Sequence, residues 1–301
     1  MSAAKKRKSK RSAVIPPGLR NFGALMLGPG RPVLIAILLA AATFAAWHFV
    51  WREVRDDVLS SESYLVTPQK VELTPLPDWI HTDVRGDVFR SAGLDGPLSI
   101  MDEDLAERIK NAFSLHPWVG KVERVRKLPQ ARVKVDLVYR RPVCMVEVPA
   151  GLLPVDIGGV LLPVDDFSPI EAGRYPRLIG IDTVPLGTTG ESWSDARVVG
   201  GAEIAAAFGD TWEELNLSHI VASPSGITSE YTYTLLTRGG TQIRWGLAPG
   251  SNAPGELPAT EKVARLQRYV RQYGSLEDRN VPQELDVHKL HEPRVSSRPK
   301  S

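Results

Sequence analysis

Eighteen consecutive positions near the start of the chain lack any charged side chain, which is the clearest feature of its hydrophobic pattern. Residues 33–50 read VLIAILLAAATFAAWHFV. A helix of this length rises about 27 Å, close to the thickness of the hydrocarbon core of a bilayer. Trp47 and Trp51 stand at its far end, where interfacial aromatic anchors are typical. We therefore predict a transmembrane helix over residues 32–51.

Two other interpretations of this run are open. A buried helix of a soluble protein normally keeps one polar face, which this run lacks. A cleaved signal peptide is the second alternative, because residues 40–42 match the A-x-A pattern of a cleavage site. Cleavage there, however, would leave a hydrophobic region of only seven residues behind a 31-residue leader. A retained anchor is the interpretation we favour.

Residues 66–142 show the pattern of a strand, two helices and two strands, in that order. Val71 and Leu73 alternate with polar neighbours, as in a short strand. Helical spacing begins behind Asp78, which we predict as an N-cap, and again behind Asp102. Two helices on one face of a three-stranded sheet would bury the apolar positions of both. These positions are Ile80, Val84, Val88 and Phe89 in the first helix and Leu105, Ile109, Ala112 and Phe113 in the second.

The last two strands of this segment have different patterns. Val122 and Val125 lie three residues apart, which breaks strict alternation and predicts a β-bulge. Pro129 marks a hairpin turn. In the run that follows, Val133, Val135, Leu137 and Tyr139 are expected to face in, while Arg132, Lys134 and Asp136 face out.

Residues 143–291 predict a second, strand-rich domain with two helices, so the expected fold class is α+β. We expect helices over 194–209, with Ser194 as the N-cap, and over 260–273. We expect strands at 143–148, in a hairpin at 153–161 about a Gly-Gly turn, and at 220–221, 231–237, 242–245 and 284–290.

Charge is distributed unevenly along the 301 residues. Residues 1–31 hold eight basic side chains and no acidic one, whereas the other 270 residues hold 29 basic and 35 acidic side chains, a net charge of −6. An acidic body repels phosphate backbones, which argues against nucleic-acid binding. The positive-inside rule places the basic tail in the cytoplasm and the body outside. We expect disorder in this tail and over 292–301, and a linker over 52–65.

The sequence predicts no catalytic residue, no cofactor site and no metal site. The sequence lacks the G-x-S-x-G, H-E-x-x-H and P-loop patterns. Cys144 is the single cysteine, which excludes a disulfide framework, and we expect it to be buried. His288 and His291 fall in a predicted strand and tail, where they would not share a metal. The carboxylates of residues 102–104 and of Asp165 and Asp166 are explained by a helix start and a solvated loop.

The element order and six residues carry a resemblance to a known family. The order over 66–142 resembles a POTRA domain. The run Pro117-Trp118-Val119, the turn at Pro129 and the exit Arg141-Pro142 are similar to the FtsQ/DivIB family of bacterial division proteins. The later hairpin, the Pro-x-Leu-x-Gly step at 176–180 and the late strand with Asp286 also resemble that family, although its usual Asp-Leu-Arg is replaced here by Asp286-Val287-His288.

The resemblance implies a single-pass inner-membrane scaffold at the division septum. Its body would lie in the periplasm and bind other membrane-anchored division proteins. Its helix would contact lipid, and the basic tail is a second candidate for contact with anionic head groups. The alternative is a POTRA-type chaperone module of an envelope assembly machine, which predicts tandem units and a membrane β-barrel.

The predicted partner site is the last strand, over 284–290. Because only a polar tail follows it, we expect this strand at a sheet edge, open to pairing with an extended partner segment. The resemblance also implies a partner site in this C-terminal region. The residues that we assign to partner binding are Leu285, Val287, Lys289 and Leu290.

Overall fold

The computed structural model describes residues 31–60, 64–225, 230–251, 253–277, 283–288 and 296–297. The chain divides into two compact units, Met1–Leu65 and Val66–Ser301. We describe each by itself and refer to the second as the body.

Among the described residues of the first unit, 31–60 form the helix α2 (Arg31–Ser60). Residues 35–52 of α2 are long and apolar enough to cross a membrane, and none of them is buried within the protein. The rings of Trp47 and Trp51 stack one turn apart, with centroids separated by 6.1 Å. The helix continues eight residues beyond this window, so the linker expected over 52–65 is helical as far as Ser60.

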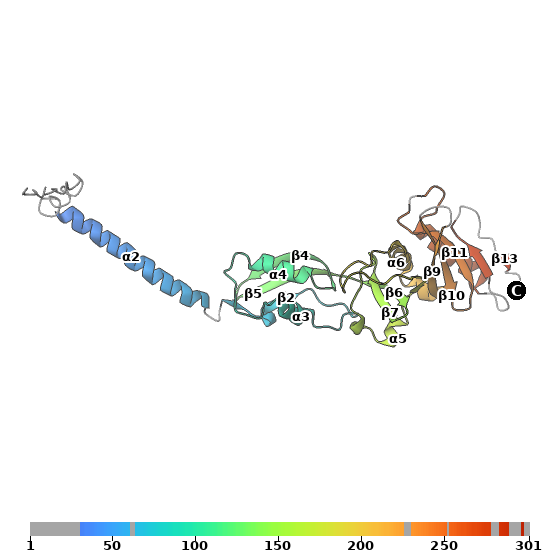
Figure 1. Ribbon diagram of the computed structural model, residues 1–301, viewed down its shortest axis with the longest axis horizontal. Coiled ribbons are helices and arrows are strands. Elements are labelled where there is room, and N and C mark those ends of the chain that lie inside the picture. Colours follow the sequence, from blue (N-terminus) through green and yellow to red (C-terminus); the bar gives the residue numbers. More distant parts are fainter. Residues whose placement is uncertain are drawn as a thin grey trace, which may run out of the picture. The chain divides into compact units, whose positions relative to one another are not determined.

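The first part of the body follows the predicted order of a strand, two helices and two strands (Figure 1). These elements are β2 (Val71–Leu73), α3 (Val84–Ser91), α4 (Leu105–Ser114), β4 (Val119–Leu128) and β5 (Arg132–Tyr139). The sheet order is β2-β5-β4, with β5 parallel to β2 and antiparallel to β4. The short strands β1 (Leu65–Val66) and β3 (Leu98–Ser99) form a separate pair, and η1 (Pro68–Lys70) lies between β1 and β2.

One hydrophobic core joins the two helices to the inner face of this sheet. It includes the predicted apolar positions of both helices, with Ala112 partly buried at its margin, and the alternate residues Val133, Val135 and Leu137 of β5. The ladder between β4 and β5 shifts register between Val122 and Arg124, which confirms the predicted bulge. The turn after Pro129 places Gln130 and Ala131 at positive φ.

The start of the first helix differs from the prediction. The helix begins at Val84, behind Asp83, and Asp78 lies in a turn instead of at an N-cap. The intervening segment is held by the Asp166 carboxylate, which accepts hydrogen bonds from the Thr82 hydroxyl at 2.5 Å and the His81 amide at 3.3 Å. These bonds to a distant loop fix residues 78–82 outside the helix.

The second part of the body is built on an eight-stranded mixed sheet, so the α+β class is confirmed. Its order is β13-β12-β11-β10-β9-β8-β6-β7, and the ladders β6/β8, β8/β9 and β11/β12 are parallel. The strands are β6 (Pro142–Val148), β7 (Gly151–Asp156), β8 (Arg177–Ile179), β9 (Leu217–Pro224), β10 (Tyr231–Thr237), β11 (Gln242–Leu247), β12 (Gln283–Asp286) and β13 (Ser296–Ser297).

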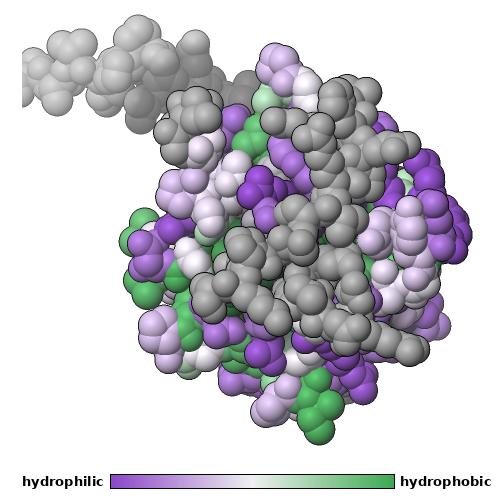
Figure 2. All heavy atoms as spheres, turned by 90° about the vertical axis from the view of Figure 1, so that its right-hand side faces the viewer, coloured by the Kyte–Doolittle hydropathy of each residue, from purple (hydrophilic) through white to green (hydrophobic). Residues whose placement is uncertain are grey.

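At the end of the body that carries β13, the described surface side chains are largely hydrophilic (Figure 2).

Two helices of this part occupy the predicted positions, α6 (Ala196–Phe208) and α8 (Ala259–Tyr273). The N-cap of α6 is Asp195, whose carboxylate accepts from the Arg197 amide at 2.8 Å, whereas Ser194 has a φ of +61°. The hairpin expected at 153–161 keeps β7 as its first strand, but its second strand is reduced to isolated bridges. The remaining short helices are η2 (Val164–Asp166), α5 (Pro169–Ala172) and α7 (Thr211–Glu214).

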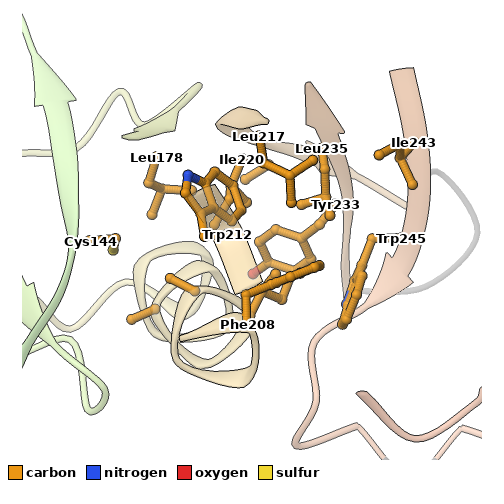
Figure 3. Packing of buried hydrophobic residues seen from close by; sticks show 14 of the residues in the cluster. Cys144, Leu178, Phe208, Trp212, Leu217, Ile220, Tyr233, Leu235, Ile243 and Trp245 are labelled. Atoms are coloured by element: carbon orange, nitrogen blue, oxygen red, sulfur yellow. The ribbon is translucent and has the colours of Figure 1, made fainter. Parts of the chain in front are cut away.

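The core of this second part gathers large aromatic side chains around α6 (Figure 3). The Phe208 ring lies 5.5 Å from that of Trp212 and 5.3 Å from that of Trp245, measured between centroids. The Tyr233 hydroxyl donates to the Arg197 carbonyl of α6 at 3.2 Å. Cys144 is fully buried in the same core, as predicted.

Candidate interaction sites

The predicted partner strand is present as β12, but it is not the end of its sheet. It pairs in parallel with β11 and, on its other side, antiparallel with β13 at Gln283 and Glu284. The expectation of a terminal edge is therefore wrong at these positions. The prediction of a disordered tail over 292–301 is also wrong at 296–297, because these residues form β13.

Of the four residues that we assigned to partner binding, the two that the structure describes have buried side chains. Leu285 and Val287 are each 1% exposed in the core of the second part. The Val287 amide donates to the Arg244 carbonyl of β11 at 3.2 Å, so it faces the sheet interior. A proline at Val287 would therefore break the fold as well as any partner contact. Lys289 and Leu290 lie outside the described residues.

Five of the six residues that carry the family resemblance lie where α4 meets β4 or where β5 meets β6. Pro117 follows α4, Trp118 is fully buried and Val119 opens β4. Arg141 is exposed, and Pro142 is the first residue of β6. The sixth, Pro129, forms the β4–β5 turn described above.

Asp166 attaches the η2 segment of the second part to the first core through Trp118. The Trp118 indole N–H donates to Asp166 Oδ2 at 2.5 Å, while Asp166 Oδ1 receives the bonds from Thr82 and His81. Asp166 is buried, which corrects the expectation of a solvated loop; its neighbour Asp165 is exposed. Leu162 is buried in the first core, so the 162–167 loop of the second part completes that core.

A second polar link lies between Arg140 and Asp156. Arg140 Nη1 donates to Asp156 Oδ2 at 2.8 Å, and Asp156 Oδ1 accepts from the amides of Gly158 and Val160 at 2.9 Å. The Trp79 indole N–H donates to the Arg140 carbonyl at 3.1 Å. Together with Asp166, these bonds hold the two cores in one arrangement within the body.

The outer edge of β4 is an open strand edge. Within the described ranges only β5 hydrogen-bonds to β4, so one side of this ten-residue backbone has no strand beside it. Unpaired N–H and C=O groups along an edge are the template for strand addition. The β4 edge is therefore a stronger candidate for partner binding than the predicted last strand.

The sheet face beside this edge is basic. Val122 and Val125 of β4 pair with core-facing residues of β5, so the intervening cross-strand pairs lie on the opposite, outer face. Two carboxylates on this face are each paired with an arginine, Asp136 with Arg126 at 3.0 Å and Glu72 with Arg132 at 3.1 Å. The five basic side chains of the outer face are Lys121, Arg124, Arg126, Arg132 and Lys134.

A groove and a pocket lie at the junction of the two cores. The groove has a volume of about 760 Å³ and runs between the ends of β4 and β5 and the α6–α7 segment. The smaller pocket, of about 280 Å³, lies between residues 78–81 and 166–175. Arg174 and Tyr175 line both, so the two spaces are neighbours.

Groups with chemical reactivity are held in structural roles. Burial raises the pKa of the Cys144 thiol to about 12, which keeps it protonated and unreactive at neutral pH. His288 contacts Asp286, and His291 lies outside the described residues. Among the residues with described placement, no three His, Cys, Asp or Glu side chains form a group able to hold a metal ion.

Sequence reasoning missed the polar links at the junction. A buried indole N–H usually has an acceptor, which was the one available signal, but the acceptor of Trp118 lies 48 residues away in sequence. Comparison with protein-family models gives no match for this chain. Comparison with curated proteins likewise gives no match.

Proposed function

We propose that this protein is a single-pass membrane scaffold that binds extended segments of other membrane-anchored proteins, and that it acts in bacterial cell division as a member of the FtsQ/DivIB type. The observation that carries the proposal is the open β4 edge in a body that follows a helix able to span a membrane. We take the strand–helix–helix–strand–strand unit as a POTRA domain, which its sheet order supports.

Binding at the β4 edge follows from main-chain chemistry. An extended segment added beside β4 would pair its backbone with the free N–H and C=O groups, which supply the affinity. Its alternate side chains would then lie next to the exposed Lys121 and Arg124 on the outer face. A segment with acidic residues at alternate positions is therefore preferred.

The anchor sets where this binding happens. In the proposed topology the basic tail is cytoplasmic, α2 crosses the inner membrane and the body is periplasmic. Confining the body and its partners to one membrane raises their effective concentration, so that weak edge contacts become productive. The proposed partners are other membrane-anchored division proteins.

A localisation experiment tests the division role. A fluorescent protein fused to the N-terminus, expressed from the native promoter in dividing cells, should concentrate at the division site. Uniform fluorescence around the membrane would overturn that role. Depletion that impairs assembly of envelope β-barrels while leaving division intact would instead indicate the chaperone module.

Charge-reversal variants test the β4 edge. The double variant Lys121→Glu with Arg124→Glu should lose partner capture after in-cell cross-linking while keeping the melting temperature of the full-length protein. Lys134→Glu is the matched control, because it alters the same sheet face from the central strand β5. Equal loss in the control would assign binding to the face and not to the edge.

A further inference from the structure

The junction pocket combines aromatic walls with carboxylates. It lies beside the Trp118–Asp166 bond, between the turn that precedes α3 and the segment around α5. Its volume of about 280 Å³ is slightly below the range of pockets that take drug-sized ligands. Three aromatic and three acidic side chains, one histidine and one arginine line it: Trp79, Phe167, Tyr175, Asp78, Asp166, Glu171, His81 and Arg174.

The aromatic walls are held in place by their own contacts. The rings of Phe167 and Tyr175 meet edge to face, with centroids 5.8 Å apart, and Phe167 also lies 6.1 Å from the Trp118 ring. The indole of Trp79 is fixed by its bond to the Arg140 carbonyl. A pocket with fixed walls loses little conformational entropy when it is filled.

Negative charge exceeds positive charge around this pocket. The buried Asp166 carboxylate is bonded by neutral donors, and no ion pair joins it to a lysine or arginine in the described part of the chain. Hydrogen bonds from the side chain and amide of Ser168 hold the pKa of Glu171 below its usual value. Asp78 adds a third carboxylate, while Arg174 is the single arginine of the wall and is exposed.

This combination selects organic cations. The faces of aromatic rings attract ammonium and guanidinium groups, and nearby carboxylates strengthen that attraction. The limited volume fits one long side chain better than a larger ligand. The adjoining groove, which shares Arg174 and Tyr175 with the pocket, offers space for residues on either side of such a side chain.

We propose that the junction pocket binds an arginine or lysine side chain presented by an extended segment of a partner protein, with the flanking residues of that segment in the adjoining groove. The choice of a protein as the source of the cation rests on the proposed scaffold function. The pocket would then provide a side-chain-specific contact in addition to main-chain pairing at the β4 edge, and the groove that continues from it reaches β4 at Gly120 and Lys121.

Binding of matched peptides tests the pocket directly. The full-length protein in lipid nanodiscs, labelled with 5-fluorotryptophan, is titrated with acetyl-Gly-Arg-Gly-amide and with the neutral analogue in which citrulline replaces arginine. The Trp79 fluorine resonance, assigned with Trp79→Phe, should shift saturably with the arginine peptide. Affinity for the citrulline peptide should be weaker by about tenfold, since its loss of charge removes the cation–π and ion-pair contributions.

Charge-neutral variants locate the binding. Glu171→Gln and Asp78→Asn keep side-chain shape and should each weaken the arginine peptide by roughly fivefold. Glutamine at 171 can still complete the capping box of α5, so the fold is preserved. Asp165→Asn is the control, because this exposed carboxylate does not line the pocket and its loss should leave affinity unchanged.

Three results would overturn the inference. These are equal affinity for the citrulline peptide, no saturable shift with the arginine or the corresponding lysine peptide, and unchanged affinity in both charge-neutral variants. Saturable binding of tetramethylammonium without binding of either cationic peptide would also overturn it, by indicating a small-molecule site. None of these measurements depends on cellular localisation, so the outcome is separate from that of the division experiment.

Discussion

The indole N–H of Trp118 donates to Oδ2 of Asp166 at 2.5 Å, and this bond attaches η2 of the second part to the first hydrophobic core. Trp118 belongs to the helix-to-strand corner after α4, whereas Asp166 ends η2 in the second part. The same carboxylate fixes residues 81 and 82 ahead of α3. One buried side chain therefore sets both the start of a helix and the attachment of η2 to the first core.

Replacing this carboxylate should destabilise the whole body. Asp166→Asn keeps the shape of the side chain. However, its amide N–H₂ group would face at least one of the three groups that now donate to Asp166, and that donor would be left unpaired. We expect a loss of about 1–3 kcal/mol in the free energy of unfolding, measured by urea denaturation. Asp165→Asn, at the exposed neighbouring position, should change it by less than about 0.5 kcal/mol. Similar effects of the two variants would contradict the role of Asp166.

Removing the Trp118 ring should cost more. Trp118→Ala leaves a cavity in a fully buried site and removes the donor to Asp166, so we expect a loss of about 3–5 kcal/mol. Thermal and chemical unfolding of the full-length protein measure this change. Leu115→Ala is the control, because Leu115 lies three residues away and is 84% exposed. An unchanged melting temperature for Trp118→Ala would show that the corner tolerates an empty site.

Local patterns in the sequence predict most elements of the body. Alternation in residues 132–137, three-residue spacing at Val122 and Val125, and helical spacing over 260–273 each correspond to an observed element. These signals work because burial of one face imposes the period of the element on the sequence. The membrane-spanning candidate follows in the same way from length and composition.

What the sequence did not predict depends on contacts between distant residues. The start of α3 is set by Asp166, which lies 84 residues from Thr82, and no local rule separates Asp166 from its exposed neighbour Asp165. The prediction that the last strand forms a sheet edge was wrong because residues 296–297 form β13, which pairs with β12. The junction pocket likewise combines segments almost 90 residues apart, so its members could not be grouped from spacing alone.

The buried Cys144 thiol should make stability fall at alkaline pH. Burial raises its pKa from 9.0 to about 12, so between these values the unfolded chain releases the proton and the folded protein keeps it. The stability that this difference contributes is fully present below pH 9.0 and is lost as the pH rises to about 12. The free energy of unfolding, compared at about pH 8 and about pH 11, should fall more in the wild type than in Cys144→Ala.

Burial of Cys144 also predicts that its thiol is protected from chemical labelling, which gives an independent check of that burial. In the native protein Cys144 should not react with Ellman's reagent at neutral pH, and it should react fully after unfolding in guanidinium chloride. The tyrosines whose pKa is also raised are present in both proteins, so their effect cancels in the comparison with Cys144→Ala. Rapid labelling of the folded protein, or equal alkaline losses, would contradict this burial.

Because α6 packs closely on the sheet, replacing Gly201 with alanine should destabilise the protein, which is the opposite of the usual effect in a helix. Alanine normally stabilises the interior of a helix by about 1 kcal/mol relative to glycine. A Cβ atom at Gly201, however, would lie 2.6 Å from Cδ1 of Leu178 on β8, too close for any real contact. Gly201→Ala should therefore lower the free energy of unfolding, by about 1–3 kcal/mol through overpacking. If it stabilised the protein instead, α6 would not approach β8 as closely as described. The double variant with Leu178→Ala should be less destabilised than the sum of the two single variants, because removing the leucine side chain makes room for the new methyl group.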